Sequence, residues 1–167
     1  HLSEHIGKLP CVMVTPFDQV YIIGRSEERR RFMDMILSQT DVTYMDALIN
    51  YNRALEQRNK LIKIFQKSGV FDTLEIEIYN DKLNSTAKII QEKRREFFSE
   101  FKEPFQKYYN YISSNKEQVN VEYKTYEGNL IDNLHLCYEK DKAIGYTTQG
   151  IHRDDLVFFL NDYNVHY

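Results

Sequence analysis

The stretch that decides the fold reads YMDALINYNRALEQRNKLIKIFQKSG over residues 44–69 and LEIEIYNDKLNSTAKIIQEKRREFFSEFKEPFQKYYNYI over residues 74–112. In both halves, apolar or long side chains recur every three or four residues, which keeps one face of an α-helix continuous. Because two such stripes can bury each other, the pattern predicts two long helices that face each other. The first stripe is Tyr44, Leu48, Tyr51, Leu55, Arg58, Ile62 and Phe65; the second is Ile76, Tyr79, Leu83, Ala87, Ile90, Arg94, Phe97, Phe101, Phe105 and Tyr108.

The break between the two patterns carries signals for the end of one helix and the start of the next. Lys67-Ser68-Gly69 offers a glycine that can cap a helix C-terminus, and Asp72-Thr73-Leu74-Glu75 has the form of a capping box. A connection this short requires antiparallel helices. We therefore expect a long antiparallel helical hairpin that projects from a base formed by the residues before Asp41 and after Ser114.

Short strands are expected in this base, so the predicted fold class is mainly α with minor β (α+β). An apolar run at Cys11–Thr15, stopped by Pro16, is typical of a strand buried on both faces. The apolar strands at the two chain ends suggest pieces of a larger sheet. Further strands are predicted near 119–126, at Ile144–Thr148, at Leu156–Leu160 and at Tyr163–Val165, with a short helix from Leu130 to Asp141-Lys142.

Composition and overall charge narrow the classes of protein. The chain is 42% hydrophobic and 28% charged, with a net charge of −3 at pH 7, which argues against a surface that coats nucleic acid everywhere. Apolar runs are too short to span a membrane and no signal peptide is recognised, so we expect a cytoplasmic protein without membrane contact. Cys11 and Cys137 lie in apolar surroundings without zinc-ligand spacing, which favours two reduced core cysteines and no metal site.

Local charge is uneven along the chain. Residues 53–67 contain five basic residues and one acidic residue, whereas residues 116–167 contain five basic and nine acidic residues. Clustered positive charge on a projecting helix attracts a polyanion such as the phosphate backbone of DNA. The candidate phosphate contacts are Arg53, Arg58, Lys60, Lys63, Lys67, Arg94 and Arg95.

The same charges are equally common on the solvated face of a helical hairpin that serves as a dimer or partner surface. In that alternative, an exposed apolar ridge such as Leu61 and Ile64 would carry the contact. A third basic group, Arg29-Arg30-Arg31, follows the plausible N-cap Ser26. These arginines are expected mostly to project away from an apolar face of Phe32, Ile36 and Leu37.

Motifs for catalysis are missing from the sequence. The phosphate-binding pattern G-x-x-x-x-G-K-[ST] is absent, and no Ser/His/Asp set or carboxylate pair has a positional reason to be close. We therefore expect no enzymatic activity from this chain by itself.

Three segments taken together resemble the middle of the bacterial RecF family. They read LPCVMVTPFD at 9–18, GRSEERRRFMD at 24–34 and GYTTQGIHRDD at 145–155, and Tyr51 with Leu55, Gln57, Arg58 and Asn59 also fits. Their order agrees with the family over nearly the whole chain. Ile151 is a departure, because the family usually has proline in Gly-Pro-His-Arg-Asp-Asp.

The resemblance implies a DNA-repair ATPase related to SMC and Rad50 proteins, with an ABC-type head and a helical lid inserted between its halves. Such proteins bind ATP and Mg, form ATP-dependent homodimers, recognise duplex DNA near single-strand gaps, and help RecO and RecR load RecA. In the family the Walker A loop precedes this region, while the signature and Walker B follow it. The chain would thus hold part of an incomplete head and its connection at 1–40, the lid at 41–143 with one strand, and return strands of the head at 144–167, without a cofactor of its own.

The resemblance also suggests roles for single residues. Thr15 to Asp18 occupy the place of the nucleotide-sensing Q-loop, with Asp18 as the candidate residue. Arg29, Arg30 and Arg31 lie where the head joins the lid and are expected to form ion pairs with the acidic base. A structural or subunit-contact role is expected for His152, Arg153, Asp154 and Asp155. The alternative is a structural or protein-interaction hairpin of another SMC-like protein without direct DNA contact.

Overall fold

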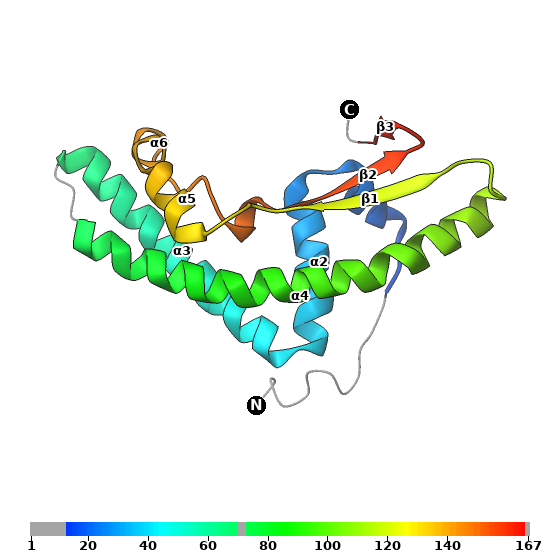
Figure 1. The fold of residues 1–167 in the computed structure, drawn as a ribbon, viewed down its shortest axis with the longest axis horizontal. Coiled ribbons are helices and arrows are strands. Elements are labelled where there is room, and N and C mark those ends of the chain that lie inside the picture. Colours follow the sequence, from blue (N-terminus) through cyan, green and yellow to red (C-terminus); the bar gives the residue numbers. More distant parts are fainter. Residues whose placement is uncertain (1–12, 70–72, 166–167) are drawn as a thin grey trace. The chain divides into compact units, whose positions relative to one another are not determined.

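A computed structural model describes residues 13–69 and 73–165, and these residues form two compact units (Figure 1). Of the described residues, 13–42, 92–124 and 154–165 form unit 1. Residues 43–69, 73–91 and 125–153 form unit 2. The long helix α4 (Thr73–Ser113) supplies residues to both units.

Helices dominate the chain, and a small antiparallel sheet accompanies them, which confirms the predicted α+β class. Unit 1 contains η2 (Pro16–Gln19), α1 (Val20–Ile23), α2 (Ser26–Thr40) and the strands β1 (Val119–Lys124), β2 (Asp155–Leu160) and β3 (Tyr163–Asn164). Unit 2 contains nearly all of α3 (Val42–Ser68), together with α5 (Leu130–Leu136), α6 (Tyr138–Ile144) and η3 (Ile151–Arg153).

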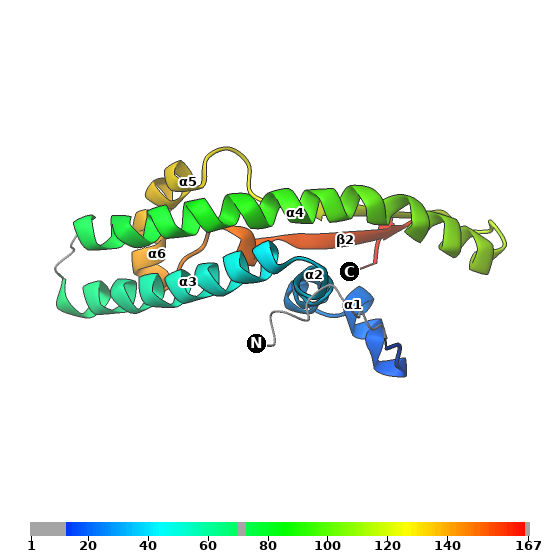
Figure 2. The ribbon, with the colours of Figure 1, turned by 90° about the horizontal axis from the view of Figure 1, so that it is seen from below.

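The hairpin expected from the sequence forms the body of unit 2. Helix α3 and the first part of α4 run antiparallel and side by side (Figure 2). Gly69 ends the first helix as expected: its φ is +70° and its N–H donates to the carbonyl of Phe65 at 3.0 Å. Asp72, which the sequence places in a capping box, lies outside the described residues.

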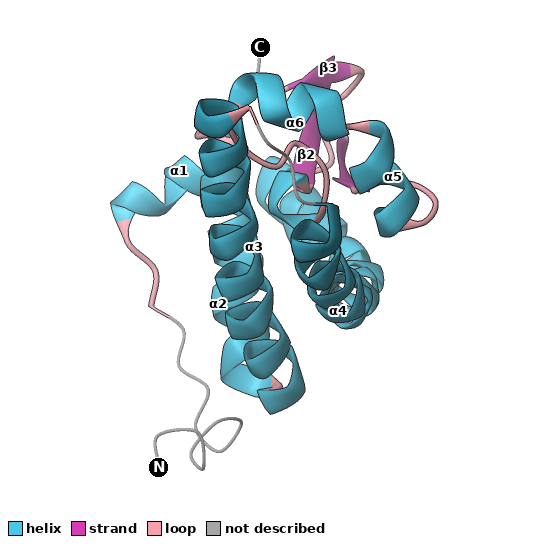
Figure 3. Cartoon of the chain, turned by 90° about the vertical axis from the view of Figure 1, so that its left-hand side faces the viewer, coloured by secondary structure: helices cyan, strands magenta, loops and turns pink. Residues whose placement is uncertain are grey.

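The core of unit 2 joins the two helices to the later part of the chain. Leu61, Ile62, Phe65 and Ile76 form a buried apolar cluster, against which Tyr138 of α6 packs. Helices α5 and α6 lie together on one side of the α3–α4 pair (Figure 3). The predicted stripes are confirmed in outline, although Ala47 and Ala54 are buried where the stripe has Leu48 and Leu55, and Tyr108 is 66% exposed.

Unit 1 covers one face of its sheet with aromatic residues. The strand order is β1-β2-β3, all antiparallel, and Val121 pairs with Phe158 across the first two strands. Phe101 and Phe105 of α4 stack with a centroid distance of 5.3 Å, and Phe105 meets Phe158 edge-on at 5.5 Å. Met33 of α2 completes this buried cluster. The strands predicted near 119–126, at Leu156–Leu160 and at Tyr163–Val165 are thus confirmed.

The strand predicted at Ile144–Thr148 is wrong. Ile144 ends α6, and Gly145 caps that helix with a φ of +88°. Side chains then take the backbone donors that a strand would use: Asn59 Oδ1 accepts from the N–H of Thr147, and Asp141 Oδ1 accepts from the N–H of Thr148, both at 2.8 Å. Local side-chain acceptors therefore replace a sheet ladder.

Two further expectations need correction or fall outside the described chain. The single short helix predicted from Leu130 is two helices, α5 and α6, which meet at Cys137. Of the strand predicted at Cys11–Thr15, the first two residues lie outside the described residues. Met13–Thr15 has no regular secondary structure and leads into η2.

The aromatic cluster of unit 1 gives a direct test of this packing. Replacing Phe158, which is 5% exposed, by alanine is expected to lower the free energy of unfolding by about 3–5 kcal/mol, because the cavity cannot fully collapse. Urea denaturation of the full-length protein measures the change. Tyr163→Ala is the matched control, since its side chain is 79% exposed and the expected change is within about 0.5 kcal/mol. Equal losses for both variants would contradict the described core.

Candidate nucleic-acid interface

A buried arginine organises the polar interior of unit 2. Arg58 of α3 is fully buried, and its Nε donates to Asn80 Oδ1 of α4 at 2.7 Å. Its Nη1 donates to Asp141 Oδ2 of α6 at 2.8 Å and to Thr147 Oγ1 at 2.7 Å. One side chain therefore binds two helices and the loop after α6 to α3.

Asp141 extends this network to the loop. Its other oxygen, Oδ1, accepts from the N–H and from the hydroxyl of Thr148, at 2.8 and 2.6 Å. Asn59 holds Thr147 through the backbone N–H and the hydroxyl, at 2.8 and 2.7 Å. Beside this cluster, burial raises the pKa of Tyr138 above its ordinary range, so the phenol stays protonated. Each buried charge in the network is thus balanced by several directed hydrogen bonds.

His152 belongs to the same unit and is held by both ring nitrogens. Nε2 lies 3.0 Å from the carbonyl oxygen of Thr147, which can only accept, so Nε2 carries the proton. Nδ1 then accepts from the hydroxyl of the buried Tyr51 at 2.7 Å. Gly150, with a φ of +130°, is needed here because a Cβ at this position would collide with the Tyr51 hydroxyl.

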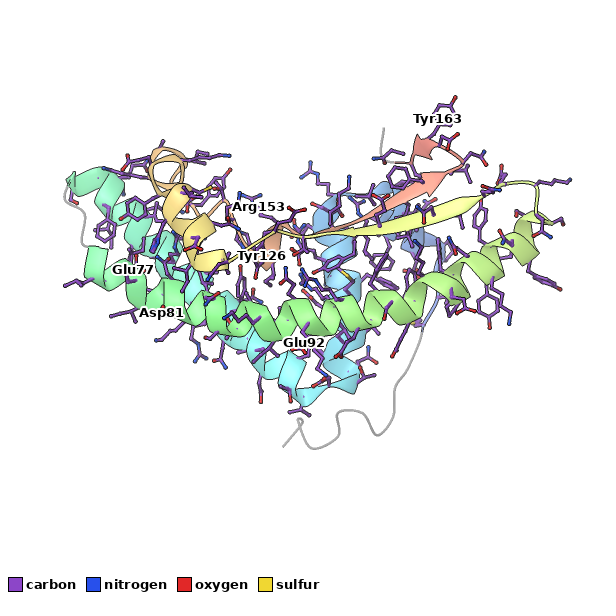
Figure 4. All side chains as sticks on the ribbon, viewed as in Figure 1. Glu77, Asp81, Glu92, Tyr126, Arg153 and Tyr163 are labelled. Carbon is purple, nitrogen blue, oxygen red and sulfur yellow. The ribbon has the colours of Figure 1, made fainter. Side chains whose placement is uncertain are left out.

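Arg153, labelled in Figure 4, is exposed, and its guanidinium carbon lies 5.3 Å from the centre of the Tyr146 ring. This geometry is that of a cation–π contact. In the same unit, His135 Nε2 of α5 donates to Glu77 of α4, also labelled in Figure 4, at 2.8 Å. The carboxylate of Glu77 is therefore already bound by a neighbouring group.

Unit 1 has its own buried arginine, Arg94 of α4. It is 1% exposed, its Nη1 donates to Asp154 Oδ2 at 2.8 Å and its Nη2 donates to Asp34 Oδ1 at 2.7 Å. Tyr123 also donates to Asp154, and Arg30 donates to the carbonyl of Asp154 at 2.7 Å. Burial, with the nearby charge of Arg94, lowers the pKa of Arg30.

The ion pairs expected for Arg29 to Arg31 are confirmed for Arg29. Its Nε and Nη2 grip both oxygens of Asp155, at 2.6 and 3.0 Å, in the bidentate geometry that guanidinium groups favour. The expectation that these arginines project away is wrong for Arg29, which is 3% exposed on the buried face with Met33 and Leu37. Arg31 is exposed.

The prediction that Arg58 and Arg94 contact phosphate is wrong for this structure. Both lie on the stripes that bury the helices, and both are ion-paired to buried carboxylates. Pulling either guanidinium out to meet DNA would leave Asp141 or Asp154 as an uncompensated buried charge. The sequence assigned these two residues to the stripe and to the phosphate contacts at once, and the burial shows that only the first is correct.

The other basic candidates on α3 are exposed on one side of the helix. Arg53, Lys60, Lys63 and Lys67 fall, at 100° per residue, within an arc of roughly 80° that lies opposite the buried stripe. We call these four residues the basic face. Lys60 pairs with Glu56 at 2.6 Å and thereby lowers the pKa of Glu56, but both side chains are more than half exposed. Such a surface pair is weak and exchanges readily.

Arg95 is exposed on α4 in unit 1. Asp18 is half-buried in unit 1, where its carboxylate accepts from the backbone N–H of Thr15 at 2.7 Å and from the Thr15 hydroxyl at 3.2 Å. The carboxylate therefore closes the turn that begins η2. The apolar ridge expected at Leu61 and Ile64 is only half correct, because Leu61 is 9% exposed and belongs to the core, whereas Ile64 is 56% exposed.

A groove of about 490 Å³ opens between α3 and α4 in unit 2. Its charged lining residues are Arg53 and Lys82, and none of its lining residues is acidic. Sequence reasoning missed Lys82, whose Nζ lies 5.6 Å from the centre of the Tyr79 ring. The sequence signal that could have identified Lys82 is its position in the second predicted helix, outside the buried stripe, where a lysine is expected to be exposed. The lining residues are Asn50, Arg53, Ala54, Gln57, Tyr79, Lys82, Ser85 and Thr86.

Within residues 13–69 and 73–165, no helix is long and apolar enough to cross a membrane, and no group of three or more potential metal-binding side chains is found.

The contact between Gly150, Tyr51 and His152 yields a testable coupling. Gly150→Ala is expected to destabilise unit 2, because the new methyl group meets the Tyr51 hydroxyl and the φ is unfavourable for alanine. Tyr51→Phe alone should cost about 1 kcal/mol through loss of the hydrogen bond to His152. The double variant should cost less than the sum of the single variants in urea denaturation, because the clash is relieved. Additive losses would contradict the geometry.

Two adjacent arginines provide a second, internally controlled test. Arg94→Gln is expected to lower the free energy of unfolding by about 3–5 kcal/mol, since it leaves two carboxylates without their partner. Arg95→Gln should change it by less than about 0.5 kcal/mol, since Arg95 is exposed. Both variants have the same composition, so thermal or urea unfolding compares burial alone. Similar stabilities would refute the buried role of Arg94.

Comparison with known proteins agrees with the resemblance read from the sequence. No family model matches the chain. The DNA replication and repair protein RecF of Phocaeicola vulgatus is 43% identical over 166 residues, which cover 98% of this chain and 44% of that protein. The RecF of Flavobacterium johnsoniae is 40% identical over 165 residues, covering 98% and 46%.

Solved structures give the same result. The recombination mediator protein RecF-ATP in the RecFOR pathway superposes with a TM-score of 0.87 at 26% identity, over 96% of this chain and 45% of that one. The RecF-ATPrS structure gives 0.82 at 27% identity, over 90% and 43%. The chain thus spans less than half the length of these relatives. We conclude that this chain is similar, over almost its whole length, to one segment of the RecF proteins.

Proposed function

We propose that the basic face of α3 binds the phosphate backbone of duplex DNA as part of a RecF-like repair protein. The observation that carries the proposal is the position of the cations around α3. Arg58 lies on the buried stripe, and four further cations are exposed on the opposite side of the helix. Within the described residues, Arg53, Lys63 and Lys67 form no ion pair, so no carboxylate competes with a phosphate for them. The relatives are named DNA replication and repair proteins, which supports DNA as the polyanion.

Contacts of this kind position the protein without reading sequence. Lysine and arginine on phosphates release counterions, so affinity should fall linearly on a log scale with salt, with a slope of about −0.9 for each contact. The basic face extends from Arg53 to Lys67 of α3, and these 14 residue-to-residue steps span roughly 21 Å at about 1.5 Å per residue. One DNA strand advances about 3.4 Å per phosphate, so this track matches roughly six nucleotides. Base preference is not expected, because phosphate contacts carry no sequence information.

The proposal extends to a longer protein in which this chain would form one segment. The likeness to a RecF-ATP structure supports an ATP-binding head completed by the remaining sequence. We further propose Mg as the metal partner of the nucleotide and ATP-dependent dimers as the working form. In that setting residues 1–40 and 144–167 belong to the head and 41–143 to the lid. The proposed partners are gapped duplex DNA, RecO and RecR, with RecA loaded indirectly.

Several residues keep proposed roles in this larger assembly. Asp18 would belong to the Q-loop, and release from the Thr15 N–H would free its carboxylate to respond to nucleotide. The exposed Arg31 and Arg153 are the members of their motifs that remain available for head–lid or subunit contact. Arg29, Arg30, His152, Asp154 and Asp155 would hold the backbone that presents them, through the hydrogen bonds described above.

The second candidate function is a protein-interaction hairpin of an SMC-like protein without direct DNA contact. The exposed Ile64, between Lys63 and the buried Phe65, is the observation that favours it. In that case charge reversal on α3 should leave DNA affinity unchanged, and Ile64→Glu should weaken dimer formation in the presence of ATP.

Charge reversal on the basic face separates the two candidates. Lys63→Glu/Lys67→Glu in the full-length protein is expected to weaken duplex binding by about tenfold or more and to reduce the salt slope by about two. The matched control is Lys116→Glu/Lys140→Glu, which changes two exposed lysines elsewhere to the same residue. Fluorescence anisotropy of a labelled duplex between 50 and 200 mM salt measures both quantities. Unchanged affinity and slope in the first variant would reject the proposal.

A further inference from the structure

The groove between α3 and α4 continues the basic face onto a second helix. Arg53 belongs to both: it is the N-terminal member of the basic face, and it lines the groove. Lys82 brings a second cation to the groove from α4. A polyanion that follows α3 from Lys67 towards Arg53 would therefore meet Lys82 at the end of its path.

The two groove cations are available to a ligand. Within the described residues, no carboxylate lies within 4.0 Å of the Arg53 guanidinium or the Lys82 ammonium. The nearby acid Glu77 is bound to His135 and to the amide of Asn80. Asp81, labelled on α4 in Figure 4, is exposed and does not line the groove.

The remaining lining residues fit a phosphate with its attached sugar. In the described part of the chain, the amide groups of Asn50 and Gln57 make no hydrogen bond, so both can donate to non-bridging oxygens. Ser85 and Thr86 already donate to the carbonyl of Lys82, at 3.1 and 2.7 Å, so the donors for a phosphate come from the other lining residues. The Tyr79 ring and Ala54 form an apolar wall of the groove. Such a wall suits the deoxyribose next to a phosphate better than it suits a further carboxylate of an acidic peptide.

We infer that the α3–α4 groove seats one backbone phosphodiester of the bound DNA strand, clamped between Arg53 and Lys82. This inference rests on the proposed DNA binding by the basic face and adds a defined end to that track. The planar guanidinium of Arg53 can bind two phosphate oxygens, whereas the Lys82 ammonium acts as a point charge on the opposite wall.

The test removes both groove charges in the full-length protein. Arg53→Gln/Lys82→Gln is expected to weaken binding of a labelled duplex about tenfold and to reduce the salt slope by about two. Lys88→Gln/Lys140→Gln is the matched control, since both lysines are exposed and neither lines the groove. Arg53→Lys/Lys82→Arg keeps both charges and should retain the slope. Circular dichroism and urea unfolding confirm that each variant folds.

The outcomes separate this inference from the proposal beneath it. If Lys63→Glu/Lys67→Glu weakens binding but Arg53→Gln/Lys82→Gln leaves affinity and slope unchanged, the phosphate seat is refuted, and DNA contact by the basic face stands without Arg53. If neither variant affects binding, both ideas fail. If the groove instead takes an acidic peptide, neither DNA nor phosphate would displace a labelled poly-glutamate from the protein. Arg53→Gln/Lys82→Gln would then leave the duplex affinity unchanged, and the phosphate seat would be overturned. If Arg53→Lys/Lys82→Arg reduced the salt slope as much as Arg53→Gln/Lys82→Gln does, a charge clamp would be excluded.

Discussion

The buried ion pair between Arg58 and Asp141 is the constraint on which unit 2 depends. Removing a guanidinium and a carboxylate from water costs several kcal/mol for each ion, and their mutual attraction together with further hydrogen bonds offsets this cost. Here Asn80 and Thr147 accept from Arg58 and Thr148 donates to Asp141, while Nη2 of Arg58 is buried without a hydrogen-bond partner among the described residues. The network can form in one register of α3 against α4, so the same charges that are expensive to bury also specify the packing.

Unit 1 follows the same rule with different residues. Arg94 is bound by Asp154 and Asp34, and Arg29 grips Asp155, so the buried arginines of this unit also connect helices to the start of β2. Position on the helix thus decides what an arginine does. Those on the buried stripe hold the fold together, while Arg53 and the lysines on the opposite side of α3 are exposed to solvent. The acidic excess of the C-terminal residues is partly consumed by these internal pairs.

The sequence predicted what local pattern controls and missed what distant side chains control. The stripes of α3 and α4, the cap at Gly69 and the strands β1 and β2 follow from periodicity and turn chemistry within short windows. The strand prediction for residues 144–148 was wrong because the side chains of Asn59 and Asp141 accept hydrogen bonds from the backbone N–H groups of this segment. Lys82 was missed because the groove exists only once two helices pair. Arg58 received two incompatible roles because charge alone does not reveal burial.

A double-mutant cycle on Arg58 and Asp141 measures the central constraint most directly. Arg58→Met and Asp141→Leu should each lower the free energy of urea unfolding of the full-length protein by about 3–5 kcal/mol, because each strands a buried charge. Their combination should cost far less than the sum, with a coupling of at least about 2 kcal/mol, because both charges are then gone. Strictly additive losses, or an Arg58→Met variant that unfolds like the unaltered protein, would contradict the account.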